Sequence, residues 1–292
     1  MSNHTLLSDI EQRLPSFSKG QKSIAHFILN HYDKAAYMTA QKLGLAAKVS
    51  ESTVVRFAFE LGFDGYPEFQ RQLQEIIKNK LTSAQRIEVA HDQIGEGDVL
   101  GKVMNIDIEK IRKTMEETSR EDFNAAVDSI LAAKRIYILG ARSALVLARF
   151  LALYFHIIFD NVKLVDTTSS SEMFEQIMRI GEGDVMIGLS FPRYSKRSAK
   201  AMEFASKSGA AIIAITDSPA SPIAEHADFF LQAKSDMASF VDSLVAPLSL
   251  LNALIVAVGL RKRDELEKMF DKLEHIYDDY DVYQKTDTGY ED

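Results

Sequence analysis

The spacing of hydrophobic residues differs between the first and second parts of the chain. Up to about residue 81, apolar side chains recur every three or four positions, which is typical of amphipathic helices. Three series show this period best: Ile24, Phe27, Ile28 and Tyr32; Leu43, Ala46 and Ala47; and Val54, Phe57, Ala58 and Leu61. From Arg135 onward, short apolar runs alternate with segments of helical length. The pattern predicts an all-α domain followed by an α/β domain.

Five short apolar runs are the expected strands: residues 136–139, 162–165, 185–189, 211–215 and 229–231. Four of them are expected to be buried on both faces, as strands of parallel sheets are. Their alternation with helices predicts a doubly wound, five-stranded parallel sheet. Ligands of such sheets bind beyond the carboxyl ends of the strands, near the reversal of strand order. The loops at Gly140 and Ser190 lie at such ends.

The domain boundaries follow from changes in composition. We expect a helical domain over residues 1–81 and a linker over 82–102, because this segment is polar and has three glycines between 95 and 101. The α/β domain is expected over 103–285, followed by a tail over 286–292. It opens with a helical pair, about 103–117 and 121–132.

Two long helices are expected near the end, Ala238–Val258 and Lys262–Asp278. The first is apolar on more than one stripe, from Phe240 through Val258. Such an excess favours a subunit interface, although a fully buried core helix has the same pattern. The acidic, tyrosine-rich end from Asp278 onward is interpreted as a solvated tail.

Composition excludes several classes of protein. The 292 residues are 46% hydrophobic and 26% charged, as in a globular domain, and 0 Cys exclude disulfides and Cys-ligated metals. The first residues lack the basic and apolar regions of a signal peptide. No run of about 18 apolar residues is present, so no membrane span or membrane partner is expected. We therefore expect a cytoplasmic protein.

The net charge of -8 is unevenly distributed. Residues 1–81 carry 10 Lys or Arg against 8 Asp or Glu, whereas the remainder carries 24 against 34. The overall acidity argues against nonspecific wrapping of nucleic acid. A mildly basic N-terminal domain is still compatible with local contact to DNA.

Residues 39–63 have the form of a helix-turn-helix. The first helix is expected to end near Ala47, Val49 to fill the turn and Ser50 to cap the second helix. Residues at the start of such a second helix face base edges in the major groove. The candidate DNA-binding residues are Lys42, Lys48, Ser50, Ser52, Thr53 and Arg56. A plain helical bundle with a solvated Arg56 is the alternative.

A second motif, residues 183–196, predicts a strand, a polar loop and a helix that starts near Ser195. A helix N-terminus with hydroxyl donors favours anions, and an Arg side chain can bind a phosphate with two nitrogens. The motif therefore indicates a phosphorylated small molecule. The candidate ligand-binding residues are Arg142, Ser143, Ser190, Arg193, Tyr194 and Ser195, with Thr168 and Ser169 as candidates for sugar hydroxyls. The alternative is that Ser195 only caps its helix and Arg193 is solvated.

With both halves considered, the chain resembles the RpiR family of bacterial transcription regulators, which join a helix-turn-helix domain to a SIS (sugar isomerase) domain that senses phosphorylated sugars. The resemblance rests on Val49–Phe57 and Leu61–Phe63 in the first half. In the second half it rests on residues 136–140, 183–190 and 214–219. It implies operator DNA, a phosphorylated sugar effector and a homodimer or higher homo-oligomer as partners.

The phosphate loops depart from the family pattern. The first loop commonly reads Gly-x-Gly-x-Ser, and here Arg142 stands at the second glycine and Ala144 at the serine. In the second loop Pro192 replaces a serine and Arg193 a glycine. The resemblance then implies a phosphate site rich in guanidinium groups, which would also suit the phosphate of a sugar acid.

A sugar-phosphate isomerase with an accessory helical domain is the rival interpretation. An isomerase needs a base beside a carbonyl, and Glu172, Glu175, Glu225 and His226 are the candidates. A sugar-phosphate-binding protein without DNA activity is a third possibility. No nucleotide fingerprint and no metal-ligand spacing is present in the sequence, so we expect no cofactor and no metal. The regulator is the favoured interpretation, and an enzyme is not expected.

Overall fold

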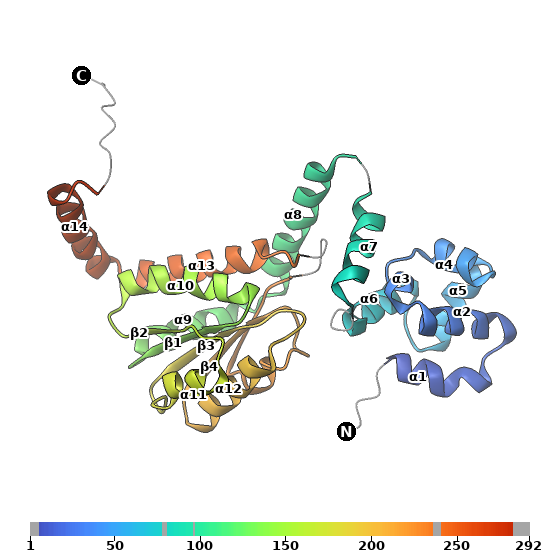
Figure 1. Ribbon diagram of the computed structural model, residues 1–292, viewed down its shortest axis with the longest axis horizontal. Coiled ribbons are helices and arrows are strands. Elements are labelled where there is room, and N and C mark those ends of the chain that lie inside the picture. The colour runs from blue at the N-terminus through green and yellow to red at the C-terminus, as the bar shows by residue number, and fades with distance from the viewer. Residues whose placement is uncertain (1–5, 78–80, 96, 236–240, 283–292) are drawn as a thin grey trace, which may run out of the picture. The chain divides into compact units, whose positions relative to one another are not determined.

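The computed structural model describes residues 6–77, 81–95, 97–235 and 241–282. They form two compact units (Figure 1). The first unit contains the chain up to Glu109 together with residues 192–194 and 235–243, and the second unit contains the remainder. The domain boundaries expected at residues 81, 102 and 285 stay a prediction.

The first unit is helical, as expected. Its elements are α1 (Leu6–Arg13), η1 (Leu14–Ser16), α2 (Lys19–Asn30), α3 (Tyr32–Ala35), α4 (Ala40–Ala47), α5 (Glu51–Glu60), α6 (Tyr66–Ile77) and α7 (Ser83–Ile94), and α8 (Val99–Glu117) begins in it. The core is built around Phe57, which meets Phe17 and Phe69 edge-on at ring-centroid distances of 5.2 and 6.0 Å. All the residues of the Val54 series are buried in this core.

Side chains of α6 fix the segment that precedes α4. The Tyr66 hydroxyl and the Gln70 amide each donate to the carbonyl of Met38 at 2.7 Å, and Gln74 donates to the carbonyl of Ala36 at 2.9 Å. Burial raises the pKa of the Tyr66 phenol. The bundle thus holds α4, and with it the turn that leads into α5.

Helices occupy most of the segment that we expected to be a linker. α7 spans Ser83–Ile94 and α8 starts at Val99, with Gly95 and Gly97 at positive φ between them. Thr82 caps α7 in a capping box with Gln85. The weak apolar periodicity of α7 has a structural reason, because one of its buried side chains is Arg86, paired with Asp242 at 2.7 Å.

The second unit is the doubly wound α/β fold that the sequence predicts. Its elements are α9 (Arg120–Ala132), β1 (Ile136–Gly140), α10 (Ser143–Ile158), β2 (Val162–Val165), α11 (Ser170–Ile177), β3 (Val185–Leu189), α12 (Lys196–Lys207), β4 (Ala211–Thr216), η2 (Ala224–His226), β5 (Phe229–Gln232), α13 (Val245–Arg261) and α14 (Arg263–Asp279). The five strands are parallel, in the order β2-β1-β3-β4-β5. All five expected strands are confirmed, and β1, β4 and β5 run one residue longer.

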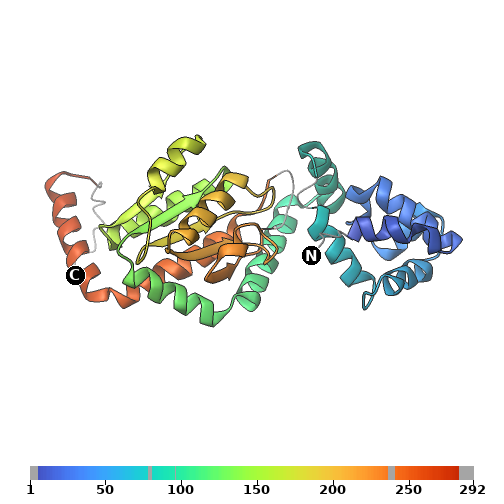
Figure 2. The same ribbon diagram turned by 90° about the horizontal axis from the view of Figure 1, so that it is seen from below.

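The two faces of the sheet are covered by different helices. Helices α9, α10 and α13 cover one face, and α11 and α12 cover the other (Figures 1 and 2). Of the residues of β1, Ile136 and Ile138 pack in the core on the first face, and Tyr137 and Leu139 pack in the core on the second. We expected four strands to be buried on both faces, and the structure has three. β1, β3 and β4 are central and buried, but β2 and β5 are edge strands with partly exposed residues.

The closing helices differ from expectation at their ends. The first was expected from Ala238, but α13 begins at Val245 and residues 241–244 are not helical; residues 238–240 lie outside the described part. α14 continues to Asp279, so the expected tail cannot begin at Asp278, and residues 286–292 also lie outside the described part. Within the described ranges no single helix could span a membrane by length and composition, and only α13 and α14, bent by 98° at their junction, pass as a pair.

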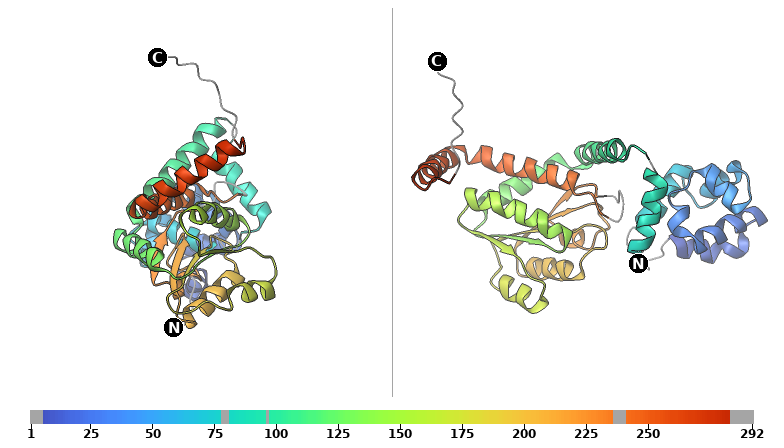
Figure 3. Two further views of the ribbon diagram at one scale, coloured as in Figure 1. Left: turned by 90° about the vertical axis from the view of Figure 1, so that its left-hand side faces the viewer. Right: turned by 45° about the horizontal axis from the view of Figure 1, so that its top comes forward.

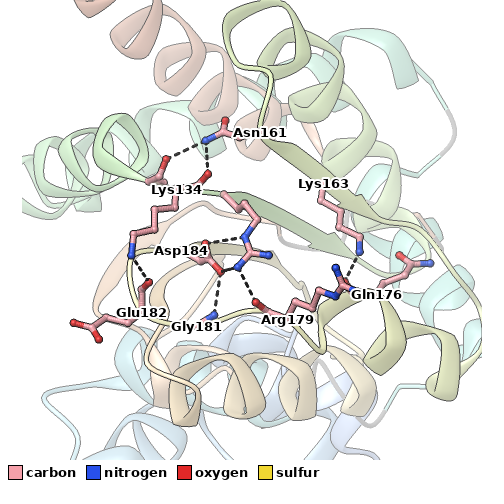
Figure 4. Close-up of polar contacts among 10 residues, drawn as sticks. Lys134, Asn161, Lys163, Gln176, Arg179, Gly181, Glu182 and Asp184 are labelled. Carbon is pink, nitrogen blue, oxygen red and sulfur yellow. Dashed lines mark hydrogen bonds and ion pairs between the residues drawn. The ribbon is translucent and has the colours of Figure 1, made fainter.

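A polar network lies at the amino-terminal ends of the strands (Figure 4). The buried Asp184 carboxylate accepts the backbone N–H of Gly181 at 3.0 Å and pairs with Arg135. The hydrogen bond from Arg135 to the Asp184 carboxylate raises the pKa of the Arg135 guanidinium. Lys134, Arg135 and Lys163 donate to backbone carbonyls between residues 176 and 182, where α11 ends. The Gly183–Asp184 motif therefore has a structural role at the edge opposite the ligand loops.

Candidate functional sites

The first candidate site is the helix-turn-helix formed by α4 and α5. α4 ends at Ala47, and Lys48 takes a left-handed conformation (φ 57°) that ends the helix. The side chain of Ser50 accepts the backbone N–H of Thr53 at 3.3 Å, so Ser50 is the N-cap that the sequence predicts. Val49 is partly buried against the core and its N–H donates to the carbonyl of Gly44.

Gly44 allows the two helices to meet closely. A Cβ at this position would lie 2.9 Å from the carbonyl oxygen of Val49 and 3.3 Å from the backbone nitrogen of Glu51. Real Cβ atoms do not approach backbone at the shorter distance, so only glycine fits without a shift. The angle at which α5 leaves the turn therefore depends on this residue.

The outer face of α5 is exposed and is polar at the start of the helix, with Phe59 exposed near its end. Ser52 and Arg56 are exposed and Thr53 lies at the flank, whereas Val54, Phe57 and Ala58 are buried on the opposite face. Arg56 Nε donates to the carbonyl of Ser52 at 3.2 Å. Ser50, Ser52 and Arg56 also line a shallow depression at the start of the helix. Lys42 on α4 and Lys48 at the C-cap of this helix are both exposed.

The second candidate site is at the carboxyl ends of the strands. In the order β2-β1-β3-β4-β5 the chain leaves β1 towards one edge and returns to β3 on its other side. The ends of β1 and β3 thus flank the reversal of strand order, where ligands of doubly wound sheets bind. Ser143 is the first residue of α10 after β1, and the buried Ser190 directly follows β3.

The two arginines of the predicted phosphate loops share an unusual backbone conformation. Four non-glycine residues of the described part have positive φ, and Arg142 (57°) and Arg193 (63°) are two of them. Such a conformation is costly for a residue with a Cβ. Arg193 and Tyr194 belong with the first unit, whereas Arg142, Ser143, Ser190 and Ser195 belong with the second. Arg142, Ser143 and Ser190 follow the neighbouring strands β1 and β3 of the second unit.

The remaining predicted residues stand at helix starts. Ser195 caps α12, because its side chain accepts the backbone N–H of Ser198 at 3.3 Å. Ser169 caps α11 in the same way through Glu172. Thr168 is exposed, and its carbonyl accepts a hydrogen bond from Arg197. Two helix N-termini thus lie beyond the strand ends, and each offers unpaired N–H groups to an anion.

Two polar residues near the strand ends did not figure in the sequence prediction. Arg197 connects α12 to the loop after β2. Ser198 is buried in the first turn of α12, and its hydroxyl has no hydrogen-bond partner among the described residues. Its position three residues after the Ser195 cap is the sequence signal that identifies Ser198.

The candidate bases of the rival isomerase do not form a cluster. Glu172 accepts a hydrogen bond from the Thr167 hydroxyl and Glu175 is exposed on the same helix. Glu225 is exposed in η2, and His226 is half-buried beside it. In the described ranges no three His, Cys, Asp or Glu side chains come together as a metal site would require.

A helix-turn-helix unit and a doubly wound sheet in one chain are typical of a class of protein, the ligand-responsive DNA-binding regulators. Comparison with known proteins agrees. Residues 4–80 match the helix-turn-helix domain of the rpiR family, and residues 129–257 match the SIS domain. The chain belongs to the RpiR family of helix-turn-helix transcriptional regulators.

Individual relatives are distant. The chain is 25% identical over 277 residues to the HTH-type transcriptional regulator HexR of Escherichia coli, covering 92% of this chain and 94% of that protein. The sugar isomerase domain of an RpiR transcription factor from Sphaerobacter thermophilus has the same fold (TM-score 0.59, 24% identity, 61% of this chain and 99% of that chain). So does the Vibrio vulnificus NanR protein complexed with ManNAc-6P (TM-score 0.57, 20% identity, 93% and 97%). The helix-turn-helix match and HexR place the chain among transcriptional regulators, and the two solved structures show the fold of the second unit.

Proposed function

We propose that the protein regulates genes of carbohydrate metabolism by binding operator DNA through α5 and a phosphorylated sugar or sugar acid at the strand ends. The observation that carries the proposal is the presence, in one chain, of a Ser50-capped helix with an exposed polar face and of two capped helices at the carboxyl ends of a doubly wound sheet. NanR, which has this fold, is complexed with a phosphorylated sugar. Because it would act on operator DNA, we also propose that it acts in the cytoplasm.

On DNA, α5 is the recognition helix in this proposal. Ser52, Thr53 and Arg56 would face base edges, and Lys42 and Lys48 would contact phosphates. Because helix-turn-helix proteins commonly bind paired half-sites, we propose at least a homodimer on a roughly palindromic operator.

The DNA part is tested by selecting bound duplexes from a random pool and then measuring the affinity of variants for the selected site. Arg56→Ala should lose about 1–3 kcal/mol of specific binding if Arg56 contacts a base. Arg71→Ala, which removes an exposed arginine of α6, is the matched control and should bind normally. An unchanged affinity of the Arg56 variant would show that this side chain does not contribute to DNA binding.

The effector part is tested by thermal-shift measurement against a panel of sugar phosphates and phosphorylated sugar acids, because a ligand of the native state raises its melting temperature. Arg142→Ala should reduce the shift, because Arg142 is the arginine of the predicted phosphate loops that belongs to the sheet unit. Arg142→Lys keeps the charge but loses the planar fork, so it should respond in part. Ser195→Ala should cost about 1 kcal/mol of stability as a lost cap whether or not Ser195 binds ligand. A normal response of the Arg142→Ala variant would place the effector elsewhere.

A further inference from the structure

The exposed face of α5 is partly apolar. Four side chains share it at positions i, i+3, i+4 and i+7, namely Ser52, Val55, Arg56 and Phe59. Phe59 is 55% exposed, and the partly buried Val55 lines the same shallow depression as Arg56. α5 belongs to the bundle of short helices drawn in blue (Figure 3, right). Two apolar side chains one turn apart thus alternate with two polar ones on the outside of this bundle.

Phe59 takes no part in the core of the bundle. Its neighbours on α5, Phe57 and Ala58, are fully buried there. Val55 touches this core with part of its side chain and presents the rest to solvent. A single exposed apolar side chain is ordinary in a folded protein. Phe59 differs because it continues the face that carries Arg56, where the proposed function places DNA.

The second half of α5 has no cation that could bind a phosphate. After Arg56, residues 57–63 contain no Lys or Arg. The one acid among them, Glu60, is balanced by Arg13, whose guanidinium lies 3.6 Å from the Glu60 carboxylate and donates to the Glu60 carbonyl at 2.7 Å. This end of the helix therefore has little net charge to attract or repel DNA. What it offers is apolar contact through Phe59.

The face has the spacing of a helix that contacts bases over two turns. In homeodomains, the recognition helix contacts the major groove with side chains at i, i+3, i+4 and i+7. The groove presents one apolar group, the C5-methyl of thymine, and apolar side chains contact it. We propose that Val55 and Phe59 contact the methyl groups of two thymines in each operator half-site and so determine part of the sequence specificity. This inference rests on the proposed function, in which α5 is the recognition helix.

Other bases fit these two side chains less well. Cytosine presents an amino donor and no methyl at the same place, and the purines present polar groups. An apolar side chain against such an edge excludes water without replacing its hydrogen bonds, which is unfavourable. Val55 and Phe59 are four residues apart, about 6 Å along the helix, and base pairs are about 3.4 Å apart. The two thymines should therefore be one or two base-pair steps apart.

Replacing thymine by uracil tests the contact directly, because it removes the methyl and keeps the base pair and the phosphate. The duplex is the one that the full chain selects from a random pool, with each thymine of a half-site replaced in turn. The dissociation constant is measured by fluorescence anisotropy at one salt concentration, since salt alone changes the affinity. Uracil at either of two positions should weaken binding by the parent chain about fourfold, as expected for the loss of one buried methyl group.

Protein variants assign each methyl to a side chain. With Val55→Ala or Phe59→Ala, the uracil and thymine duplexes should bind equally well at one of the two positions, and the parental ratio should persist at the other. Arg56→Ala should weaken binding to both duplexes by the same factor and keep both ratios. Ile87→Ala removes an equally exposed apolar side chain of α7 and should behave as the parent chain does. Because each ratio compares two duplexes with one protein sample, a change in folding cancels.

Three results would overturn the inference. The first is a selected half-site without thymine, and the second is an affinity of the parent chain that no uracil replacement changes. The third is a methyl dependence that persists in both alanine variants. A chain that selects no duplex would refute the proposed function, whereas a selected duplex bound without regard to its thymine methyls would refute only the assignment of Val55 and Phe59.

Discussion

Replacing Asp184 by alanine should destabilise the sheet unit without touching either candidate site. The Asp184 side chain is 1% exposed and makes three contacts at the amino-terminal edge of the sheet (Figure 4). Oδ2 accepts the N–H of Gly181 at 3.0 Å, and the two carboxylate oxygens meet Arg135 Nε and Nη2 at 3.1 and 3.0 Å. The Asp184→Ala variant loses all of these acceptors.

The size of the effect follows from the exposure of each partner. The side chain of Arg135 is 46% exposed, so water replaces its lost contacts. The ion pair with Asp184 therefore adds little to the free energy of unfolding. The bond to Gly181 is different, because it joins a half-buried N–H to a fully buried charged acceptor. A hydrogen bond of this kind contributes about 1.5–3 kcal/mol, and we expect Asp184→Ala to lower the free energy of unfolding by about that amount.

Urea unfolding followed by circular dichroism measures the loss, and hydrogen exchange of β1 and β3 assigns it to the sheet. Asp184→Asn keeps an oxygen that can accept from Gly181, so it should lose less than half as much as the alanine variant. Arg135→Ala should also lose less than Asp184→Ala. A loss below about 0.5 kcal/mol for Asp184→Ala, or an equal loss for Arg135→Ala, would refute this account of the buried carboxylate.

Three further predictions concern other parts of the chain. Gly44→Ala should destabilise the helix-turn-helix by about 1–3 kcal/mol, because its Cβ would lie 2.9 Å from the Val49 carbonyl; thermal unfolding that matches the parent would show that the turn can relax. Tyr66→Phe should cost about 1 kcal/mol by removing the bond to the Met38 carbonyl, measured by urea unfolding, and a neutral result would mean that water replaces it. The pKa of His275 should lie above 6.5 in an NMR titration, because the ring nitrogen bonds to the carbonyl one turn earlier and nearby carboxylates add to the effect. Its raised pKa stabilises α14 below about pH 6.5, and that contribution should disappear as the pH rises through the folded-state pKa; a pKa at or below 6.5 would contradict it.

Features that depend on a few adjacent residues were predictable. The strands came from continuous apolar runs, and every one of them was found within one residue of its expected end. Ser50 and Ser195 were recognisable as caps, because a serine before an amphipathic run supplies the acceptor that the first turn lacks. The buried and exposed faces of α5 followed from helical spacing alone.

Features that depend on distant residues were not predictable. We expected a linker at α7, because an arginine at position 86 indicates an exposed segment. Arg86 is buried only because it pairs with Asp242, 156 residues away in the sequence. The helix expected from Ala238 begins only at Val245, although the apolar pattern continues through 241–244. Arginine itself does not signal the positive φ at Arg142 and Arg193, because it rarely takes this conformation; only the glycines of the family pattern at these two positions point to it.

The sequence by itself determined the class of fold, the helix-turn-helix and the strand ends at which a ligand would bind. These depend on local periodicity and caps, whose free energies involve neighbours in the chain. Only the tertiary structure decided which polar residues are structural, such as Asp184, and which apolar surfaces stay uncovered, such as the stripe of α14. The physical reason is that burial is a property of packing: the same amphipathic helix is core or surface according to what the folded chain places against it.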